Sequence, residues 1–155
     1  MSTPDMLEIE EISTMRVARV TAEGESPEIG AFQALFDWSR EHKNSVPERV
    51  RFFGFNDPCP EPGQTVYKYE AWMTVNDDAV GSETVTMNTH RGGRYAVLVT
   101  PLGEIEQAWE RLVGMVRESS YRIGQGPALE EALSNPVETS FAQAVMKLYL
   151  PISEG

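Results

Sequence analysis

The sequence predicts an α+β fold in which two pseudo-symmetric β-α-β-β repeats form one antiparallel sheet, with two long helices on one face and a groove between them. Two amphipathic helical patterns carry this prediction, because Phe32–Trp38 aligns with Trp109–Met115 at an offset of 77 residues. A β-branched strand pattern precedes each helix, and two further strand patterns follow it. Each helix has one apolar face to bury, so both are expected on the same side of a shared sheet.

The first repeat centres on a helix expected from about residue 27 to residue 43. Ile29, Phe32, Leu35 and Phe36 recur there at helical spacing. The strand patterns around it are rich in β-branched and aromatic residues, and they lie at residues 7–12, 15–21, 50–55 and 67–75.

The second repeat centres on a helix expected from residue 105 to about residue 118, with Ile105, Trp109, Leu112 and Val116 on one face. Its strands are expected at residues 95–100, within 126–136 and at 144–152. In the alignment of the repeats, Phe52 matches Glu130 at an offset of 78, and residues 67–75 match 144–152 at an offset of 77. We therefore expect one domain, residues 1–155, with repeats at about 7–76 and 84–153.

Two adjacent carboxylates, Glu130 and Glu131, stand out in the expected strand between Gly126-Pro127 and Asn135-Pro136. Neighbouring strand residues point to opposite faces, so one carboxylate must point to the apolar side. A buried carboxylate costs several kcal/mol unless it is compensated. No basic residue lies nearby in the sequence, so the compensation comes either from hydrogen bonds within the fold or from an external cation.

The composition is strongly acidic, with 13 basic and 24 acidic residues and a formal charge of −11. This charge argues against direct nucleic-acid binding and favours cationic ligands. The single cysteine, Cys59, cannot form an internal disulfide, which fits a reducing compartment. There is no long apolar run and no signal-peptide pattern, so we expect a cytoplasmic protein that does not enter a membrane.

Five motifs in order resemble the GyrI-like effector-binding domains, which are the ligand modules of AraC-type and MerR-type transcription regulators. They are Gly54-Phe-Asn-Asp-Pro58, Tyr67-Lys-Tyr-Glu-Ala-Trp-Met-Thr-Val75, Gly92-Gly-Arg-Tyr-Ala96, Pro127-Ala-Leu-Glu-Glu131 with Asn135-Pro136, and Leu148-Tyr-Leu-Pro-Ile152. Together they span residues 12–152. The resemblance implies a groove between the helices, lined by aromatic residues, with an acidic residue at its base and cationic, aromatic or lipophilic ligands.

In the family's Pro-x-x-Glu strand the acidic position corresponds to Glu130, and a strand-end tyrosine partner corresponds to Tyr149. The repeat alignment adds Phe52 and Trp72 at matching positions. The sequence departs from the resemblance at Ala132, where many relatives have an aromatic residue or histidine, so the groove is expected to be wider or less selective. No helix-turn-helix domain is attached, so we expect a stand-alone domain that is not itself the DNA-bound regulator.

The candidate ligand-binding residues share an acidic or aromatic side chain in or beside these strands and helices. They are Glu130, Tyr149, Trp72, Glu70, Phe52, Trp109, Tyr95, Trp38 and Glu131. Each has an alternative. The aromatic residues also suit the core, Glu70 also suits a solvated strand position, and a slipped strand would bury Glu131 in place of Glu130. His42 and His90 have no third ligand, and Cys59 has no base nearby, so no metal, cofactor or catalytic nucleophile is expected.

The favoured function is a binding domain for lipophilic or aromatic cationic compounds, which sequesters a compound or senses it through a protein partner. The alternative from a different class is a hydrolase of electrophilic small molecules, because the resemblance includes such relatives. In it, Glu130 or Glu70 would activate water and Tyr149 would polarise the substrate. A third reading is a protein-binding module of the gyrase-inhibitor type.

Overall fold

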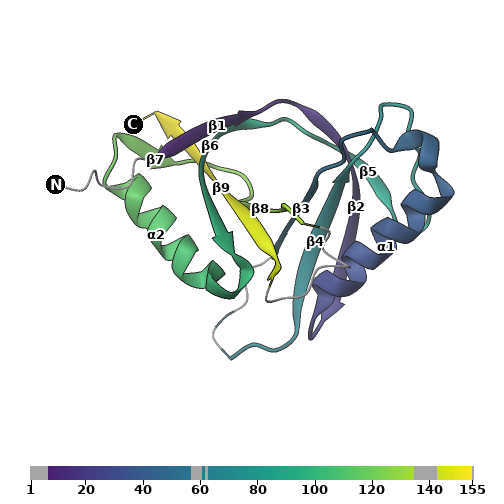
Figure 1. The fold of residues 1–155 in the computed structure, drawn as a ribbon, viewed down its shortest axis with the longest axis horizontal. Coiled ribbons are helices and arrows are strands. Elements are labelled where there is room, and N and C mark those ends of the chain that lie inside the picture. Colours follow the sequence, from purple (N-terminus) through teal and green to yellow (C-terminus); the bar gives the residue numbers. More distant parts are fainter. Residues whose placement is uncertain (1–6, 57–60, 62, 135–142, 155) are drawn as a thin grey trace.

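The computed structural model describes residues 7–56, 61, 63–134 and 143–154. It confirms the predicted α+β class, with an antiparallel sheet and two helices (Figure 1). The elements are β1 (Glu8–Ile12), β2 (Met15–Gly24), α1 (Pro27–Glu41), β3 (Phe52–Asn56), β4 (Tyr67–Thr74), β5 (Thr86–His90), β6 (Gly93–Pro101), α2 (Ile105–Arg117), β7 (Tyr121–Ile123), β8 (Leu129–Ala132) and β9 (Val145–Glu154), with short 3-10 turns at Lys43–Ser45 and Leu102–Glu104. The Asp57-Pro58 and Asn135-Pro136 turns and Cys59 lie outside the described residues.

The strand order is β1-β6-β9-β8-β3-β4-β2-β5, and β7 pairs separately with β9. Strands β3 and β8 therefore pair at the centre of the sheet. Next to β3 lie β4 and β2 from the first half of the chain, and next to β8 lie β9 and β6 from the second half. They are joined by three residue pairs, Phe52–Ala132, Phe53–Glu131 and Gly54–Glu130. This short central pairing is where the two halves of the sheet are in contact.

A row of directly paired residues defines the face that carries both helices. Ala71, Gly54, Glu130 and Leu148 are neighbours across β4, β3, β8 and β9. Paired residues in a sheet point to the same face. Ala71 packs in the cluster beneath α1 and Leu148 in the cluster beneath α2. Both helices therefore cover one face, and Glu130 lies between them.

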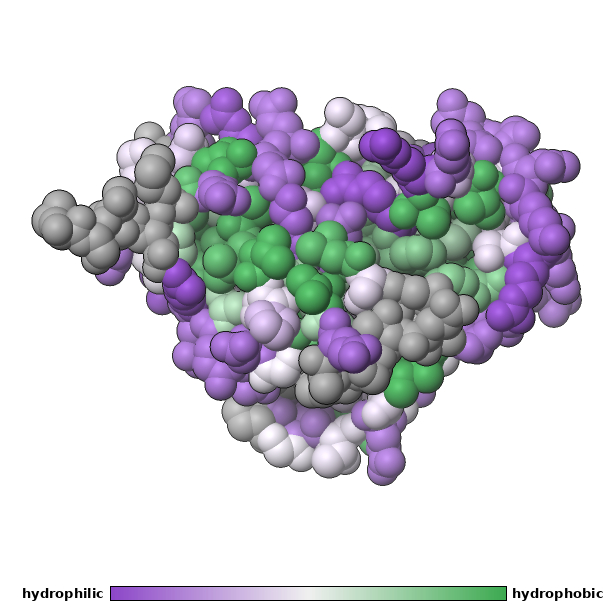
Figure 2. Space-filling view, in the orientation of Figure 1, coloured by the Kyte–Doolittle hydropathy of each residue, from purple (hydrophilic) through white to green (hydrophobic). Residues whose placement is uncertain are grey.

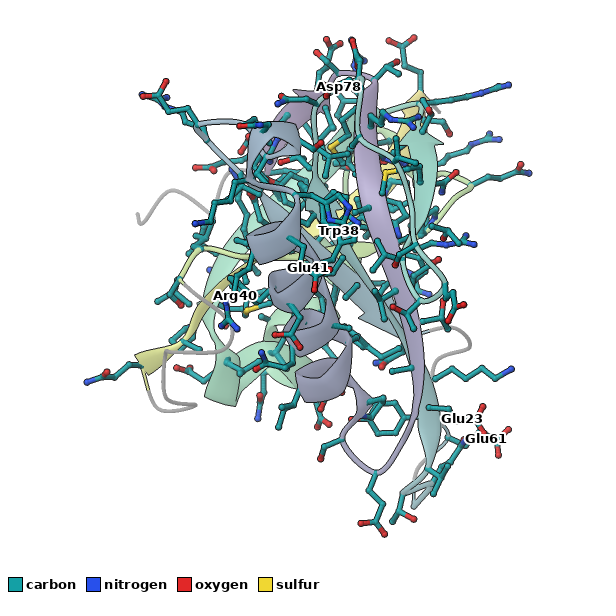
Figure 3. All side chains as sticks on the ribbon, turned by 90° about the vertical axis from the view of Figure 1, so that its right-hand side faces the viewer. Glu23, Trp38, Arg40, Glu41, Glu61 and Asp78 are labelled. Atoms are coloured by element: carbon teal, nitrogen blue, oxygen red, sulfur yellow. The ribbon has the colours of Figure 1, made fainter. Side chains whose placement is uncertain are left out.

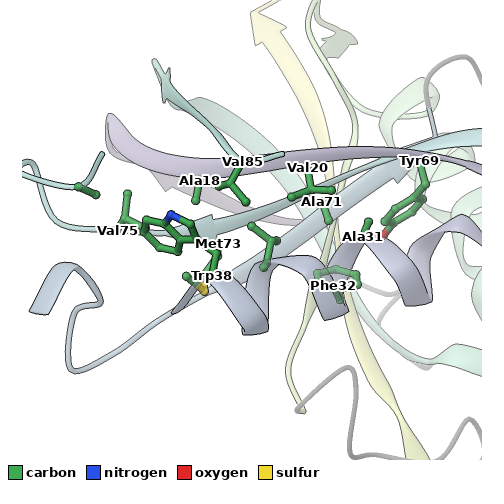
Figure 4. Packing of buried hydrophobic residues seen from close by; sticks show 12 residues of the cluster. Ala18, Val20, Ala31, Phe32, Trp38, Tyr69, Ala71, Met73, Val75 and Val85 are labelled. Atoms are coloured by element: carbon green, nitrogen blue, oxygen red, sulfur yellow. The ribbon is translucent and has the colours of Figure 1, made fainter. Parts of the chain in front are cut away.

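Helix α1 packs on β2 and β4 through a cluster of small and large apolar residues (Figure 4). The helix begins with Pro27 at its first position, where the missing N–H costs nothing. Leu35 is completely buried, and Phe32 and Trp38 extend the contact toward the two ends of the helix. Helix α2 makes the equivalent contact with β6 and β9, with Leu112 and Val116 completely buried.

The opposite face of the sheet has its own apolar cluster, which contains no helical residue. It is built from Ile12, Val17, Phe53, Trp72, Tyr95, Val97, Leu129 and Tyr149. A strand ribbon encloses this cluster. The pairs Ile12–Gly93 of β1 with β6 and Met15–His90 of β2 with β5 share one register, because two residues lie between them on each strand. The two ends of the strand order are thus joined by a two-stranded ribbon that keeps its register across a two-residue interruption in each strand, and the sheet is curled.

The strand registers correct one part of the predicted repeat alignment. Trp72 pairs with Phe53, and Tyr149 pairs with Leu129. If Trp72 corresponds to Tyr149, then Phe53 corresponds to Leu129, and the next residue, Gly54, corresponds to Glu130. The alignment of Phe52 with Glu130 is shifted by two residues. The shift was invisible in the sequence because residues two apart on a strand share a face.

The remaining differences from the sequence prediction are at the edges. Strands β5 and β7 were not predicted, and the helices end at Glu41 and Arg117 rather than at 43 and 118. The residues of β5, Thr86–His90, are mostly polar and form an edge strand, so they lack the apolar alternation that reveals a strand.

Candidate functional site: an acidic groove between the helices

A cavity of about 1460 Å³ lies between the two helices, over the centre of the sheet. Its walls include Phe32 of α1 and Trp109 of α2, and its floor includes Tyr69 of β4 and Glu130 of β8. Hydrophobic residues gather over the middle of this face, with hydrophilic residues around its outline (Figure 2). The cavity is large enough to hold a small molecule, and its lining is mixed apolar and polar, as in small-molecule sites.

Glu130 is the carboxylate at the base of this cavity. Its Oε2 accepts a hydrogen bond of 2.9 Å from the indole N–H of Trp109. Burial raises the pKa of Glu130 above its usual value, the Trp109 hydrogen bond lowers it, and the negative charge of Glu28 raises it further. The charged form of Glu130 is therefore held at a cost that a cation in the cavity would offset.

Glu28, in the first turn of α1, is a second carboxylate in the lining. Both of its carboxylate oxygens lie within hydrogen-bonding distance of the Tyr67 hydroxyl, at 3.0 and 2.9 Å. Burial and this hydrogen bond raise the pKa of Tyr67 to about 12, so the phenol stays protonated and donates. Glu28 and Tyr67 are thereby fixed against one wall.

Tyr69 fills the floor beside Glu130. Its ring lies over Gly54, where an added Cβ would be 2.6 Å from the Tyr69 Cε2 atom and would overlap the phenol. Burial and the charges of Glu130 and Glu28 raise the pKa of Tyr69 well above its usual value. The missing side chain at Gly54 thus gives Tyr69 the space to lie flat between the two halves of the sheet.

The charge of the lining is one-sided. The described residues that line the cavity include five glutamates, Glu28, Glu70, Glu106, Glu110 and Glu130, and no lysine or arginine. The one histidine among them, His90, has a pKa lowered by burial. Such a lining attracts positive charge and repels anions.

A profile of the GyrI-like small molecule binding domain matches residues 6–153. The chain belongs to the GyrI-like family. Small-molecule binding is the property by which that family is described, and it fits the cavity between the helices. Among curated proteins, no match was found.

Solved structures with the same fold cover nearly the whole GyrI-like domain. The C-terminal domain of EcmrR superposes with a TM-score of 0.74 at 12% identity, covering 97% of this chain and 98% of that one. EcmrR in its complex with DNA gives a TM-score of 0.77 at 12% identity, and the match covers 97% of this chain but 58% of the EcmrR chain. This chain therefore corresponds to little more than half of that EcmrR chain.

Two further structures differ from EcmrR in what they are described to do. A hydrolase from Listeria innocua superposes with a TM-score of 0.67 at 14% identity, covering 94% of this chain and 91% of that one. SAV2435 bound to tetraphenylphosphonium superposes with a TM-score of 0.54 at 9% identity, covering 96% and 94%. At these identities the likeness establishes the fold.

The GyrI-like cavity brings together four of the nine residues proposed from the sequence: Glu130, Trp109, Trp72 and Glu70. Trp72 and Glu70 line it from the opposite face of the sheet, together with Phe55 and His90, so the cavity reaches both faces. Glu70 lies 3.1 Å from Arg19, which compensates its charge.

The other five residues lie outside the cavity lining: Phe52, Trp38, Tyr95, Tyr149 and Glu131. Phe52 faces the helices but stacks on Phe36 with ring centroids 5.1 Å apart. Trp38 lies between α1 and the sheet, whereas Arg40 and Glu41 lie on the outer side of that helix (Figure 3). Tyr95 belongs to the opposite-face cluster, where its hydroxyl pairs with His90 Nε2 at 2.9 Å.

Glu131 is the carboxylate that the fold itself compensates. It forms a two-pronged pair with Arg51, at 2.8 and 3.0 Å, and accepts a 2.6 Å hydrogen bond from the Tyr149 hydroxyl. Arg51 also donates to that hydroxyl at 2.9 Å. This triad lies on the face away from the helices. Compensation within the fold therefore applies to Glu131, because alternation points Glu131 toward Arg51 and Glu130 into the cavity.

The sequence interpretation missed Glu28, Tyr67 and Tyr69. A signal for the tyrosines was present, because Tyr67 and Tyr69 are two apart on one strand and so share a face. Glu28 follows Pro27 at a helix start, where an acidic residue is common for dipole reasons alone, so nothing marked it as a site residue.

Among the described residues, neither a metal site nor a helix that could span a membrane is present. No group of three or more histidine, cysteine or acidic side chains is arranged to hold a metal ion. None of the helices is long and apolar enough to cross a membrane.

Proposed function

We propose that this protein binds lipophilic, aromatic cations in the groove between α1 and α2, with Glu130 as the charge that selects them. The observation that carries the proposal is the charge of the cavity lining. Among the described residues, the lining combines aromatic side chains with carboxylates and contains no lysine or arginine. A neutral ligand would leave these charges uncompensated, and an anion would be repelled.

Glu130 provides selectivity because it is poorly solvated and has an aromatic donor rather than a cationic partner. Attraction between opposite charges strengthens as water is excluded. Phe32, Tyr67, Tyr69 and Trp109 offer ring surfaces on which an organic cation gains cation–π and apolar contact. The tetraphenylphosphonium complex of SAV2435, which has the same fold, supports this ligand class.

The test uses two probes of nearly equal shape and opposite charge, tetraphenylphosphonium and tetraphenylborate, titrated into the protein while tryptophan fluorescence is followed. We expect saturable binding of the cation only. Glu130→Gln should weaken it by about 10–100-fold, which corresponds to about 1.4–2.8 kcal/mol. Glu110→Gln removes the same charge from an exposed position of the lining and should change affinity by less than about threefold. Equal binding of both probes, or equal effects of both variants, would refute the proposal.

Hydrolysis is the second candidate, favoured by one observation. Burial raises the pKa of the Glu130 carboxyl, which favours its use as a group that exchanges a proton with substrate or water. A hydrolase from Listeria innocua shares the fold. The test is turnover of an electrophilic ester or epoxide. If Glu130→Gln stops turnover while the variant still binds the substrate, this candidate is favoured over simple binding.

The binding domain would act through a partner rather than on DNA directly. The formal charge of −11 opposes direct contact with DNA phosphates. We place this activity in the cytoplasm and propose that the cation is either sequestered or reported to a protein partner.

A further inference from the structure

Two of the carboxylates that line the groove, Glu28 and Glu130, accept a hydrogen bond from an aromatic side chain and have no basic partner among the described residues. Glu28 belongs to α1 and Glu130 to β8. Among the described residues, no lysine or arginine lies within ion-pair distance of either, whereas Glu70 and Glu131 have Arg19 and Arg51. Arg19 and Arg51 therefore compensate the two glutamates on the face away from the helices. Glu106 and Glu110 of α2 also line the cavity, but they are exposed to solvent, whereas Glu28 and Glu130 are each held by an aromatic donor.

The two carboxylates are fixed as separate charges. Glu28 is held by the hydroxyl of Tyr67 and Glu130 by the indole of Trp109, at 2.9 Å in each case. These donors belong to different elements, so the carboxylates are not a hydrogen-bonded pair that shares one proton. They still interact, because the charge of Glu28 raises the pKa of Glu130.

The space between the two charges is aromatic. Tyr67 and Tyr69 are affected by both carboxylates, since both charges raise the pKa of each phenol. Phe32, one turn along α1 from Glu28, lines the same cavity and lies 6.0 Å from the Tyr69 ring, measured between centroids. An apolar or aromatic spacer would contact these rings while its ends reached the carboxylates.

We propose that Glu28 forms a second cation subsite and that the preferred ligand is a dication, with two positive groups joined by an apolar or aromatic spacer that lies on Tyr67, Tyr69 and Phe32. This inference rests on the proposed function. A monocation at Glu130 leaves Glu28 uncompensated, whereas a dication neutralises both charges and removes their mutual repulsion.

The experiment compares decamethonium and hexamethonium, which carry two quaternary ammonium groups, with decyltrimethylammonium, which carries one on the same chain as decamethonium. Affinities are measured by calorimetry on wild type, Glu28→Gln and Glu130→Gln. We expect one of the dications to bind at least about tenfold more tightly than the monocation, which is about 1.4 kcal/mol. Glu28→Gln should lower the affinity for that dication to the affinity for the monocation, and it should change the affinity for the monocation by less than about threefold.

Tyr67→Phe is the matched control, because it removes the hydrogen bond to Glu28 and keeps the charge. It should preserve the preference for the dication. Equal affinity for one and two charges at both spacer lengths, or an equal loss of both ligands in Glu28→Gln, would overturn the second subsite while cation binding at Glu130 stands. Failure of every cation to bind wild type, with tetraphenylphosphonium included, would overturn the cation function itself and the subsite with it.

Discussion

Replacing Gly54 by alanine should destabilise the protein through one identifiable overlap. The new Cβ would overlap the buried phenol of Tyr69: the Cε2 atom would be 2.6 Å away, and the Cζ atom and the hydroxyl oxygen would be closer still. The backbone of Gly54 does not have a positive φ, so alanine brings no conformational strain of its own. The whole effect of Gly54→Ala therefore reports the position of the Tyr69 ring.

The magnitude follows from what Tyr69 must do. Its side chain is 5% exposed and packs on Phe32, so it can escape the overlap only by leaving its place in the floor of the groove. Overpacking of this kind costs about 1–3 kcal/mol, and the loss of aromatic burial places Gly54→Ala near the upper end. Gly114→Ala is the matched control. Gly114 is inside α2, where an added Cβ meets nothing within 4 Å, so alanine should stabilise by about 0.5–1 kcal/mol.

Urea unfolding followed by circular dichroism at neutral pH measures both variants. We expect the two free energies of unfolding to move in opposite directions, by about 3 kcal/mol in total. Tetraphenylphosphonium affinity should fall in Gly54→Ala and stay constant in Gly114→Ala. If Gly54→Ala unfolds within about 0.5 kcal/mol of wild type, Tyr69 does not occupy the space above Gly54, and the described floor of the groove is wrong.

Three further predictions concern the two glutamates. The pKa of Glu130 is raised in the folded state, so the native protein binds more protons than the unfolded chain. Its stability therefore falls as pH rises from the usual 4.5 through the raised value. In parallel urea titrations, Glu130→Gln should be more stable than wild type by about 1 kcal/mol at neutral pH and should have no advantage near pH 4. Trp109→Phe removes the hydrogen bond that lowers this pKa, so the pH midpoint of tetraphenylphosphonium binding should move upward, and an unchanged midpoint would contradict the role given to Trp109. Tyr149→Phe should cost about 1–2 kcal/mol of stability and Arg51→Met about 2–3 kcal/mol, because each leaves the charge of Glu131 undercompensated. Cation affinity should stay within about twofold of wild type in both variants, because this triad faces away from the helices.

The fold could be predicted because its main elements are governed by local patterns. Helical spacing marked α1 and α2, and β-branched or aromatic runs marked β2, β3, β4, β6 and β9. Strand β5 was missed because an edge strand has little apolar alternation. The repeat boundaries at about residues 7–76 and 84–153 remain a prediction. Only the registers of β3 with β4 and of β8 with β9 revealed that Glu130 corresponds to Gly54.

The site could be predicted only in part, because it depends on contacts between distant segments. Alternation required Glu130 and Glu131 to face opposite ways, but both faces of the curled sheet carry apolar clusters, so burial alone did not separate them. The deciding partner, Arg51, is 80 residues from Glu131. Glu28 and Tyr67 are likewise 39 residues apart, and no local pattern joins them.

The two-stranded ribbon formed by β1–β2 and β5–β6 has a consequence for how the protein unfolds. A chain built from two similar halves could lose one half while the other persists, as neighbouring units do in many repeat proteins. Here the chain crosses from one half into the other twice, through two residues each time, and the Ile12–Gly93 and Met15–His90 pairs keep one register across the boundary. Melting either half would require fraying the strands that hold the other, so the two halves should unfold together in a single cooperative transition.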